Sequence, residues 1–499
     1  MDFFESMLYG FSVSLQLTNL FACFMGVLIG TLIGVLPGIG PVATMSILLP
    51  VCFKMSATSA IIMMCGIFYG AMYGGSTTSI LVNIPGEAGS VVTCLDGYQM
   101  ARKGRAGPAL GIAALGSFIA GTLGVVGIMF LAPLLASVAI KFGPVEIFGI
   151  LVLSFTMVTY LAGKSKLKAM AMAILGLIIA TIGLDPIVVT PRFAYGSFTL
   201  MDGIGLVPLV MGLFGVSEVF LNIEEKVKQE VFKAHIRGLL PNKQDWKDSA
   251  FPIARGGLIG FFLGILPGMG TIIPTFISYA MEKRFSKHPE KFGTGVIEGV
   301  AAPEAANNAA TAGSMVPLLT LGIPPNVVMA VLIGAFLTHG IQPGPLLVKE
   351  HPEIFWGVIA SMYVGNVMLL ILNLPLIGIW VRVLKVPYGI LFPLILLFCL
   401  IGVYSVANNI WDIVVMLAFS VLGYLMKKFN YEPAPLILAY VLGRMAEESL
   451  RQSLSLSRGN FAIFLTHSIS CGTLIIAFAT LLSPLIISLL RRSFGRSKR

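Results

Sequence analysis

Two stretches of the sequence combine small residues with uncharged hydrogen-bond donors in otherwise apolar surroundings, namely residues 69–87 and residues 298–325. Hydroxyl and amide groups can hold a carboxylate inside a membrane without burying a bare lysine. The candidate residues for such an anion site are Ser76, Thr77, Thr78, Asn83, Asn307, Asn308 and Thr311. The alternative is that the hydroxyl groups bond only to the backbone of their own helix.

Four glycines and two prolines mark places where a membrane helix is expected to break. Residues 37–40 read Pro-Gly-Ile-Gly, residues 267–270 read Pro-Gly-Met-Gly, and an Ile-Pro pair ends each polar stretch. Proline lacks the backbone N–H and glycine relaxes the backbone, so a regular helix does not continue there. Backbone groups freed at membrane depth can hold an ion or a substrate, whereas the alternative is a plain hairpin turn. The candidate residues at these breaks are Gly38, Gly40, Gly268, Gly270, Pro85 and Pro324.

Two acidic residues accompany the polar stretches, Glu87 and Glu304. An ionisable residue inside a membrane is a functional hypothesis by default. We therefore regard both as candidates for coupling transport to a proton or sodium ion, and the alternative is a structural place near the membrane edge. No cofactor and no metal apart from sodium is expected.

Several catalytic patterns are absent from the sequence. It contains no G-x-x-x-x-G-K-[ST] phosphate loop, so ATP hydrolysis by that route is excluded. It also lacks H-E-x-x-H, G-x-S-x-G and any C-x-x-C pair. These absences argue against an enzyme.

The composition requires a membrane to position these residues. Hydrophobic residues make up 57% of the chain and charged residues 11%, which a soluble protein of this size could not accommodate. Because one helical crossing takes about 20 apolar residues, the uncharged runs predict an all-α polytopic protein with roughly ten to twelve crossings. The net charge of +10 fits basic cytoplasmic loops and gives no reason to expect nucleic acid.

An internal repeat divides the chain into two halves. Residues 26–40 and 256–270 are identical at nine of fifteen positions, including the glycines that recur every fourth residue and the Leu-Pro-Gly-x-Gly ending. Such ladders favour close helix packing, and duplication is common in secondary transporters. The sequence thus predicts a first transmembrane repeat at 1–221, a basic cytoplasmic connecting loop at 222–255 and a second repeat at 256–499. It leaves open whether the repeats are inverted and on which side the N-terminus lies.

Long runs of the sequence resemble the large membrane subunit of the tripartite tricarboxylate transporters, the TctA family. The resemblance covers essentially the whole chain and is carried by residues 30–41, 73–118, 298–325, 339–347 and 442–460. One stretch departs from the family pattern, which usually has glycine and hydroxyl residues after the second Ile-Pro. Here residues 325–329 read Pro-Asn-Val-Val-Met, which bears on the choice of substrate.

The resemblance implies uptake of a tricarboxylate, or a related dicarboxylate or aromatic carboxylate, across the bacterial inner membrane by a multi-pass protein. It implies coupling to a proton or sodium gradient. It also implies two partners, a small membrane subunit similar to TctB and a periplasmic solute-binding protein similar to TctC. The rival interpretations are a single-component anion transporter and a passive anion channel.

Overall fold

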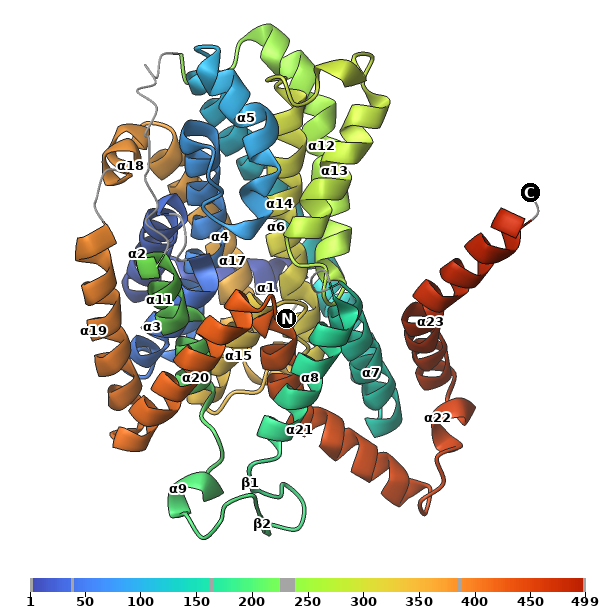
Figure 1. The fold of residues 1–499 in the computed structure, drawn as a ribbon. Coiled ribbons are helices and arrows are strands. Elements are labelled where there is room, and N and C mark those ends of the chain that lie inside the picture. The colour runs from blue at the N-terminus through green and yellow to red at the C-terminus, as the bar shows by residue number, and fades with distance from the viewer. Residues whose placement is uncertain (1–2, 37–39, 162–164, 225–237, 385–387, 497–499) are drawn as a thin grey trace. The chain divides into compact units, whose positions relative to one another are not determined.

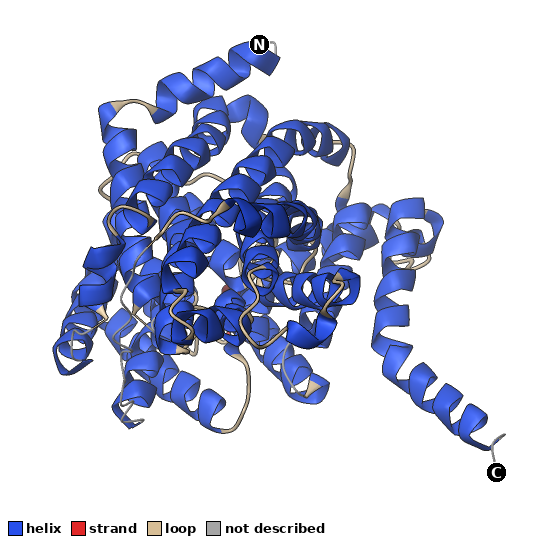
Figure 2. Ribbon diagram, turned by 90° about the horizontal axis from the view of Figure 1, so that it is seen from above, coloured by secondary structure: helices blue, strands red, loops and turns tan. Residues whose placement is uncertain are grey.

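The computed structural model describes residues 3–36, 40–161, 165–224, 238–384 and 388–496. These residues are mostly α-helical, and their strands form one short antiparallel pair (Figures 1 and 2). The expected all-α membrane protein is therefore confirmed at the level of helical content. The chain divides into two compact units, residues 1–139 with 205–425 and residues 140–204 with 426–499. Each unit combines segments from both sequence halves.

The first unit holds the polar stretches and most of the helices. Its N-terminal part comprises α1 (Phe3–Ser14), α2 (Leu17–Val35), α3 (Gly40–Cys52), α4 (Ala57–Val82), η1 (Ala88–Val91), α5 (Thr93–Arg102) and α6 (Ala106–Ala139). Its later part comprises α10 (Leu206–Val210), the π-helix η2 (Met211–Val216), α11 (Ser217–Glu224), α12 (Lys243–Ile265), α13 (Ile272–Phe285), η3 (Pro289–Lys291), α14 (Glu298–Leu321), α15 (Val327–Thr338), α16 (Leu347–Glu350), α17 (Pro352–Asn373), α18 (Ile377–Val383), α19 (Tyr388–Ala407) and α20 (Ile410–Lys428), whose last turn enters the second unit.

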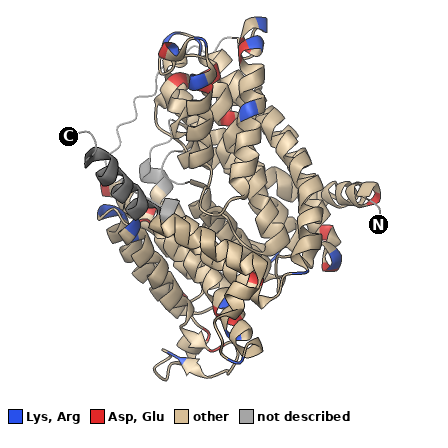
Figure 3. Ribbon diagram, turned by 90° about the vertical axis from the view of Figure 1, so that its right-hand side faces the viewer, with Lys and Arg blue, Asp and Glu red and all other residues tan. Residues whose placement is uncertain are grey.

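Five helices are long and apolar enough to cross a membrane, judged by length and composition among the described residues. They are α2, α4, α6, α17 and α20, and several shorter apolar helices accompany them. Lys, Arg, Asp and Glu lie mainly near helix ends and in connecting segments (Figure 3). This distribution follows from the high cost of placing charge in hydrocarbon. The number of crossings stays a prediction.

The two polar stretches form the most deeply buried helices, α4 and α14. Nearly every residue of each helix is buried, although both carry hydroxyl, amide or acidic side chains. The Ser56 side chain accepts a hydrogen bond from the Ser59 N–H and so caps the start of α4. The cap residues that follow the two helices, Asn83 and Gly322, both adopt the left-handed conformation that terminates a helix before the Ile-Pro pairs.

Glycine ladders bring α2 against α4 and α12 against α14. A Cβ atom at Gly30 would stand 2.5 Å from the Ile67 carbonyl oxygen, and one at Gly260 would stand 2.2 Å from that of Ala306. The glycines one turn before and after each of these positions meet carbonyl groups in the same way. Only glycine allows backbones to approach this closely. The expectation that these glycines serve helix packing is confirmed.

Helix α12 begins at Lys243, within the stretch that the sequence predicts as a connecting loop. The Asn242 side chain accepts hydrogen bonds from the backbone N–H groups of Gln244 and Asp245, and the Asp245 carboxylate accepts one from the Asn242 N–H. This reciprocal cap satisfies donors at the helix start. Residues 225–237 of the predicted loop lie outside the described residues.

The second unit comprises α7 (Pro144–Leu161), α8 (Lys166–Ala180), β1 (Gly183–Leu184), β2 (Pro191–Arg192), α9 (Phe198–Met201), α21 (Pro433–Leu456), α22 (Ile463–Thr466) and α23 (Ser468–Arg496). An ion-pair cluster ties its strand pair to α21. Arg451 contacts Asp185 at 2.7 Å and Glu447 at 3.0 Å, and Arg192 contacts Glu447 at 2.8 Å. The backbone N–H of Val188, the Arg451 guanidinium and the backbone N–H of Ile187 bond to the Asp185 carboxylate and lower its pKa well below its usual value.

Candidate functional site

Glu304 lies at the centre of a cluster of uncharged donors in the first unit. It sits on α14, is fully buried, and accepts a hydrogen bond from the Ser76 hydroxyl of α4 at 2.5 Å. Its other carboxyl oxygen accepts a hydrogen bond from the hydroxyl of Thr93, the first residue of α5. Glu304 has no cationic partner among the residues described, so neutral groups alone hold this carboxyl group.

Glu87 is held by a second set of neutral donors where the chain leaves α4. The backbone N–H of Gly89 donates to Glu87 Oε2 at 2.6 Å, and Asn307 Nδ2 of α14 donates to Oε1 at 2.9 Å. Glu87 and Ser90 also cap η1 reciprocally. The Ile-Pro-Gly turn therefore aims this acid inward, and the structure joins both predicted coupling acids to predicted donors.

Asn308 extends the polar cluster to α6. Its Nδ2 atom donates to the Ser117 hydroxyl oxygen at 2.7 Å and to the Glu304 carbonyl oxygen at 3.1 Å. Nearby, the Tyr73 hydroxyl donates to the Asn366 side chain at 2.6 Å. Polar side chains of α4, α5, α6 and α14 thus meet inside one compact unit.

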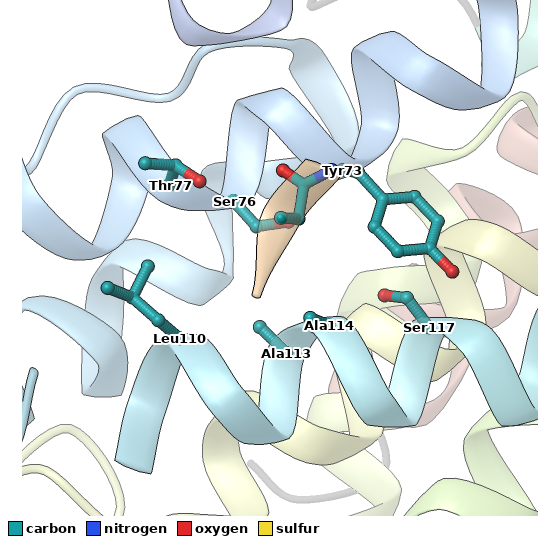
Figure 4. Close-up of a pocket in the computed structure, with 8 residues that line it drawn as sticks. Tyr73, Ser76, Thr77, Leu110, Ala113, Ala114 and Ser117 are labelled. Carbon is teal, nitrogen blue, oxygen red and sulfur yellow. The ribbon is translucent and has the colours of Figure 1, made fainter. Parts of the chain in front are cut away.

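A small cavity of about 10 Å³ lies between α4 and α6. Tyr73, Ser76 and Thr77 line one side of it, and Leu110, Ala113, Ala114 and Ser117 line the other (Figure 4). Asn373 also lines the cavity and carries a buried Oδ1 atom that no described donor reaches. The cavity has room for about one water molecule.

The remaining polar candidates lie apart from the two acids. Thr78 donates to the Val35 carbonyl oxygen of α2 at 2.7 Å, and Thr311 donates to the Asn307 carbonyl oxygen of its own helix at 3.0 Å. Asn83 is exposed and forms the left-handed cap of α4. These three residues occupy structural positions in this conformation.

The predicted helix breaks are present where the structure describes them. Gly40, Gly268 and Gly270 all have positive φ, and the Gly268 N–H donates to the Pro325 carbonyl oxygen at 2.8 Å. The second break therefore packs against the chain just after the Ile-Pro pair at Pro324, which is buried, whereas Pro85 is half-buried. Gly38 lies outside the described residues.

Thr93, Ser117 and Asp96 are among the polar residues of this unit that the sequence-based candidates leave out. Thr93 and Ser117 belong to the cluster around Glu304 and Asn308, but they stand alone in the sequence without a run of polar neighbours. Asp96 is fully buried and accepts hydrogen bonds from the Tyr279 hydroxyl and from the backbone N–H groups of Gly293, Gly295 and Val296. Asp96 therefore holds the segment before α14 in place.

Long apolar helices around a buried cluster of acids and neutral donors define a polytopic membrane transport protein. The chain belongs to the tripartite tricarboxylate transporter TctA family, because the model of that family matches residues 20–438. The resemblance seen in the sequence is confirmed. The chain is accordingly a membrane component of a transporter and not an enzyme.

Two relatives come from Agrobacterium vitis. An uncharacterized 52.8 kDa protein in the TAR-I ttuC' 3' region is 48% identical over 499 residues, which is 100% of this chain and 98% of the relative. An uncharacterized protein in the TAR-II ttuC' 3' region is 48% identical over 240 residues, which is 48% of this chain and 97% of that relative. No solved structure matches the chain.

Proposed function

We propose that this chain is the transport subunit that imports a small carboxylate across a bacterial inner membrane, coupled to a proton or sodium gradient. The substrate is a tricarboxylate or a related dicarboxylate or aromatic carboxylate. A periplasmic solute-binding protein delivers it, and a small membrane subunit completes the transporter. Family membership supports this assignment.

The proposal that transport is coupled to an ion gradient rests on the environment of Glu304. A buried carboxyl group among neutral donors is either protonated or accompanied by a cation, because an isolated buried charge is very costly. A carboxylate substrate beside Glu304 would bring further negative charge. A proton or sodium ion must therefore enter with the substrate, and the gradient of that ion then drives uptake.

In this proposal the substrate binds between the Ser76–Asn83 and Asn307–Ser314 regions, with the helix breaks close by. The donors Ser76, Thr77 and Ser117 face one cavity, which supports this placement (Figure 4). At about 10 Å³ that cavity is too small for a carboxylate substrate. Substrate entry therefore requires α4 and α6 to separate, as in an alternating-access cycle that passes through a closed state.

Two repeated transmembrane halves with broken helices would provide the moving parts. The matching contacts of Gly30 with α4 and Gly260 with α14 support this arrangement, because equivalent glycines perform equivalent packing. Secondary transporters commonly move one repeat or bundle against another around a fixed site.

The test is uptake of labelled carboxylates into proteoliposomes that contain this chain and its two partners. Moving each charge against 100 mV costs about 2.3 kcal/mol, so a dianion requires at least two cations to be accumulated. A protonophore or a sodium ionophore should abolish accumulation. Uptake that needs ATP and persists without ion gradients would refute the proposal.

The same vesicles separate the rival functions. Flux that follows the membrane potential and shows no saturation with the coupling ion would indicate a passive channel. Full activity without the binding protein would indicate a single-component transporter.

A further inference from the structure

The amide oxygen of Asn307 is buried and has no hydrogen-bond partner among the residues described. Its amide nitrogen is oriented by Glu87, to which it donates at 2.9 Å. Asn307 therefore presents an unsatisfied acceptor, and such an oxygen cannot hold a carboxylate. It requires a donor or a cation, since a buried acceptor without a partner is costly.

A second oxygen points to the same place. The position that a Cβ atom of Gly89 would occupy lies 2.3 Å from Asn307 Oδ1 and 2.8 Å from Thr271 Oγ1. Thr271 directly precedes α13 and follows the helix break at Gly268 and Gly270. The missing side chain at Gly89 therefore lets the two oxygens face the same small space.

Glu87 supplies negative charge beside these oxygens. The Gly89 N–H and Asn307 Nδ2 fix its two carboxyl oxygens at 2.6 Å and 2.9 Å. Each carboxylate oxygen can accept more than one interaction, so these bonds leave capacity for a cation. An acid from the first polar stretch, an amide from the second and a hydroxyl beside a helix break thus converge.

We propose that Glu87, Asn307 and Thr271 bind a sodium ion, which is the coupling ion of the function proposed above. Carboxylate, amide and hydroxyl oxygens are hard ligands, and hard cations prefer oxygen. One acidic group matches one monovalent charge. No group of three His, Cys, Asp or Glu suited to a metal ion occurs in the described part of the chain, which argues against a divalent metal.

A proton would not account for the same geometry. Protonation of Glu87 alone would neutralise its charge but would leave the oxygens of Asn307 and Thr271 without a shared ligand. Sodium engages all three oxygens. The cation-binding and substrate-binding roles also separate, because Asn307 serves the cation while Ser76 and Thr77 line the cavity proposed for the substrate.

The experiment is equilibrium binding of radioactive sodium to the purified full-length chain in lipid nanodiscs, with choline and potassium chloride as ionic-strength controls. Saturable sodium binding is expected. Thr271→Val and Asn307→Leu should each weaken it by about tenfold or more, the range seen when the surroundings of a metal site are altered. Thr271→Ser keeps the hydroxyl and should restore binding.

Two matched variants control for the loss of a buried hydroxyl group. Thr275 of α13 and Thr320 of α14 are buried and donate only to backbone carbonyl groups of their own helices, at 2.7 Å and 2.8 Å. Thr275→Val and Thr320→Val should bind sodium like the unaltered chain. Thr271 lies at the start of a helix and is half-buried, so its substitution tests the site even if Asn307→Leu fails to fold.

The outcomes distinguish failure of the sodium site from failure of the proposed transport function. Equal sodium affinity in Thr271→Val and the unaltered chain would overturn the site, as would the absence of saturable sodium binding. If carboxylate uptake is then driven by protons, the proposed function stands and only the sodium site fails. If sodium binds as expected but uptake follows no ion gradient, the proposed function fails while the site stands.

Discussion

The Ser76 hydroxyl donates a 2.5 Å hydrogen bond to the Glu304 carboxyl group, although the two residues are 228 positions apart in the chain. This bond joins the two polar stretches directly. The hydrogen bond between the Ser76 hydroxyl and the Met72 carbonyl oxygen of its own helix is longer, at 3.1 Å. The bond between the helices is therefore the shorter of the two that Ser76 makes. The contact links α4 and α14 at Glu304, one of the two buried acids proposed to take part in coupling.

Replacing Ser76 with alanine should reduce carboxylate uptake by about tenfold to a hundredfold. A hydrogen bond to a charged group contributes about 1.5–3 kcal/mol, and its loss also leaves Glu304 less satisfied. Ser79→Ala is the matched control, because Ser79 is buried on the same helix and donates to its own backbone at the Gly75 carbonyl oxygen. Equal uptake by the two variants, measured per amount of folded protein, would contradict a role for Ser76.

Thr77→Val and Asn308→Leu should abolish uptake while the protein still inserts in the membrane. The Thr77 side chain lines the small cavity, and Asn308 bridges to Ser117 at its wall. Thr31→Val is the control, since the buried Thr31 hydroxyl donates to the Val27 carbonyl oxygen of its own helix. Uptake assays, with parallel measurement of the amount of inserted protein, test this prediction. Near-normal transport in both variants would mean that these side chains contribute only to packing.

Alanine at Gly30 or Gly260 should lower the yield of folded protein. The added methyl group would overlap a backbone carbonyl oxygen of the facing helix, and such overpacking typically costs about 1–3 kcal/mol. Gly378→Ala is the control, because the space around Gly378 is open. Size-exclusion chromatography and thermal unfolding in detergent measure the effect. An unchanged unfolding temperature for Gly30→Ala would contradict the tight helix contact.

Gly268→Ala should impair transport more than it lowers stability. Gly268 has a φ of +82°, where an added Cβ atom costs roughly 1–2 kcal/mol. Gly104→Ala controls for this strain, because Gly104 has a φ of +79° and open space around it. Combined with Gly38→Ala, the loss of uptake should be smaller than the sum of the single losses, since residues that share a site couple. If the loss of uptake only follows the loss of folded protein, Gly268 has a structural role and no role in the transport site.

Asp185→Asn should lower the thermal stability of the protein by the same amount at pH 8 and pH 6. Two backbone N–H groups and Arg451 lower the pKa of Asp185 in the folded state below its ordinary value of 3.8. The carboxylate therefore contributes its full stabilisation above the unfolded pKa, and the contribution is lost as pH falls below about 4. Thermal unfolding at several pH values measures this. A mutant penalty that disappears between pH 8 and pH 6 would contradict the assignment.

The amino-acid sequence by itself determines that this chain is a helical membrane protein of the TctA family. Apolar runs without charge leave no soluble alternative, and the long matching stretches carry the family resemblance. It also locates the helix breaks at Gly40, Gly268 and Gly270, because the conformational limits of proline and glycine are local properties. The close packing of Gly30 and Gly260 follows from their spacing alone.

Only the tertiary structure decides which polar groups meet. Thr93 and Ser117 join the acids through contacts between helices, and no local pattern marks either residue. The same limit applies to roles, since Thr78 and Thr311 bond to backbone while Ser76 reaches Glu304. Residue types and spacing report the face of a helix, whereas the partner across that face depends on how distant segments pack. For this reason the orientation of Asn307, with its nitrogen on Glu87 and its oxygen unsatisfied, became visible only in the folded chain.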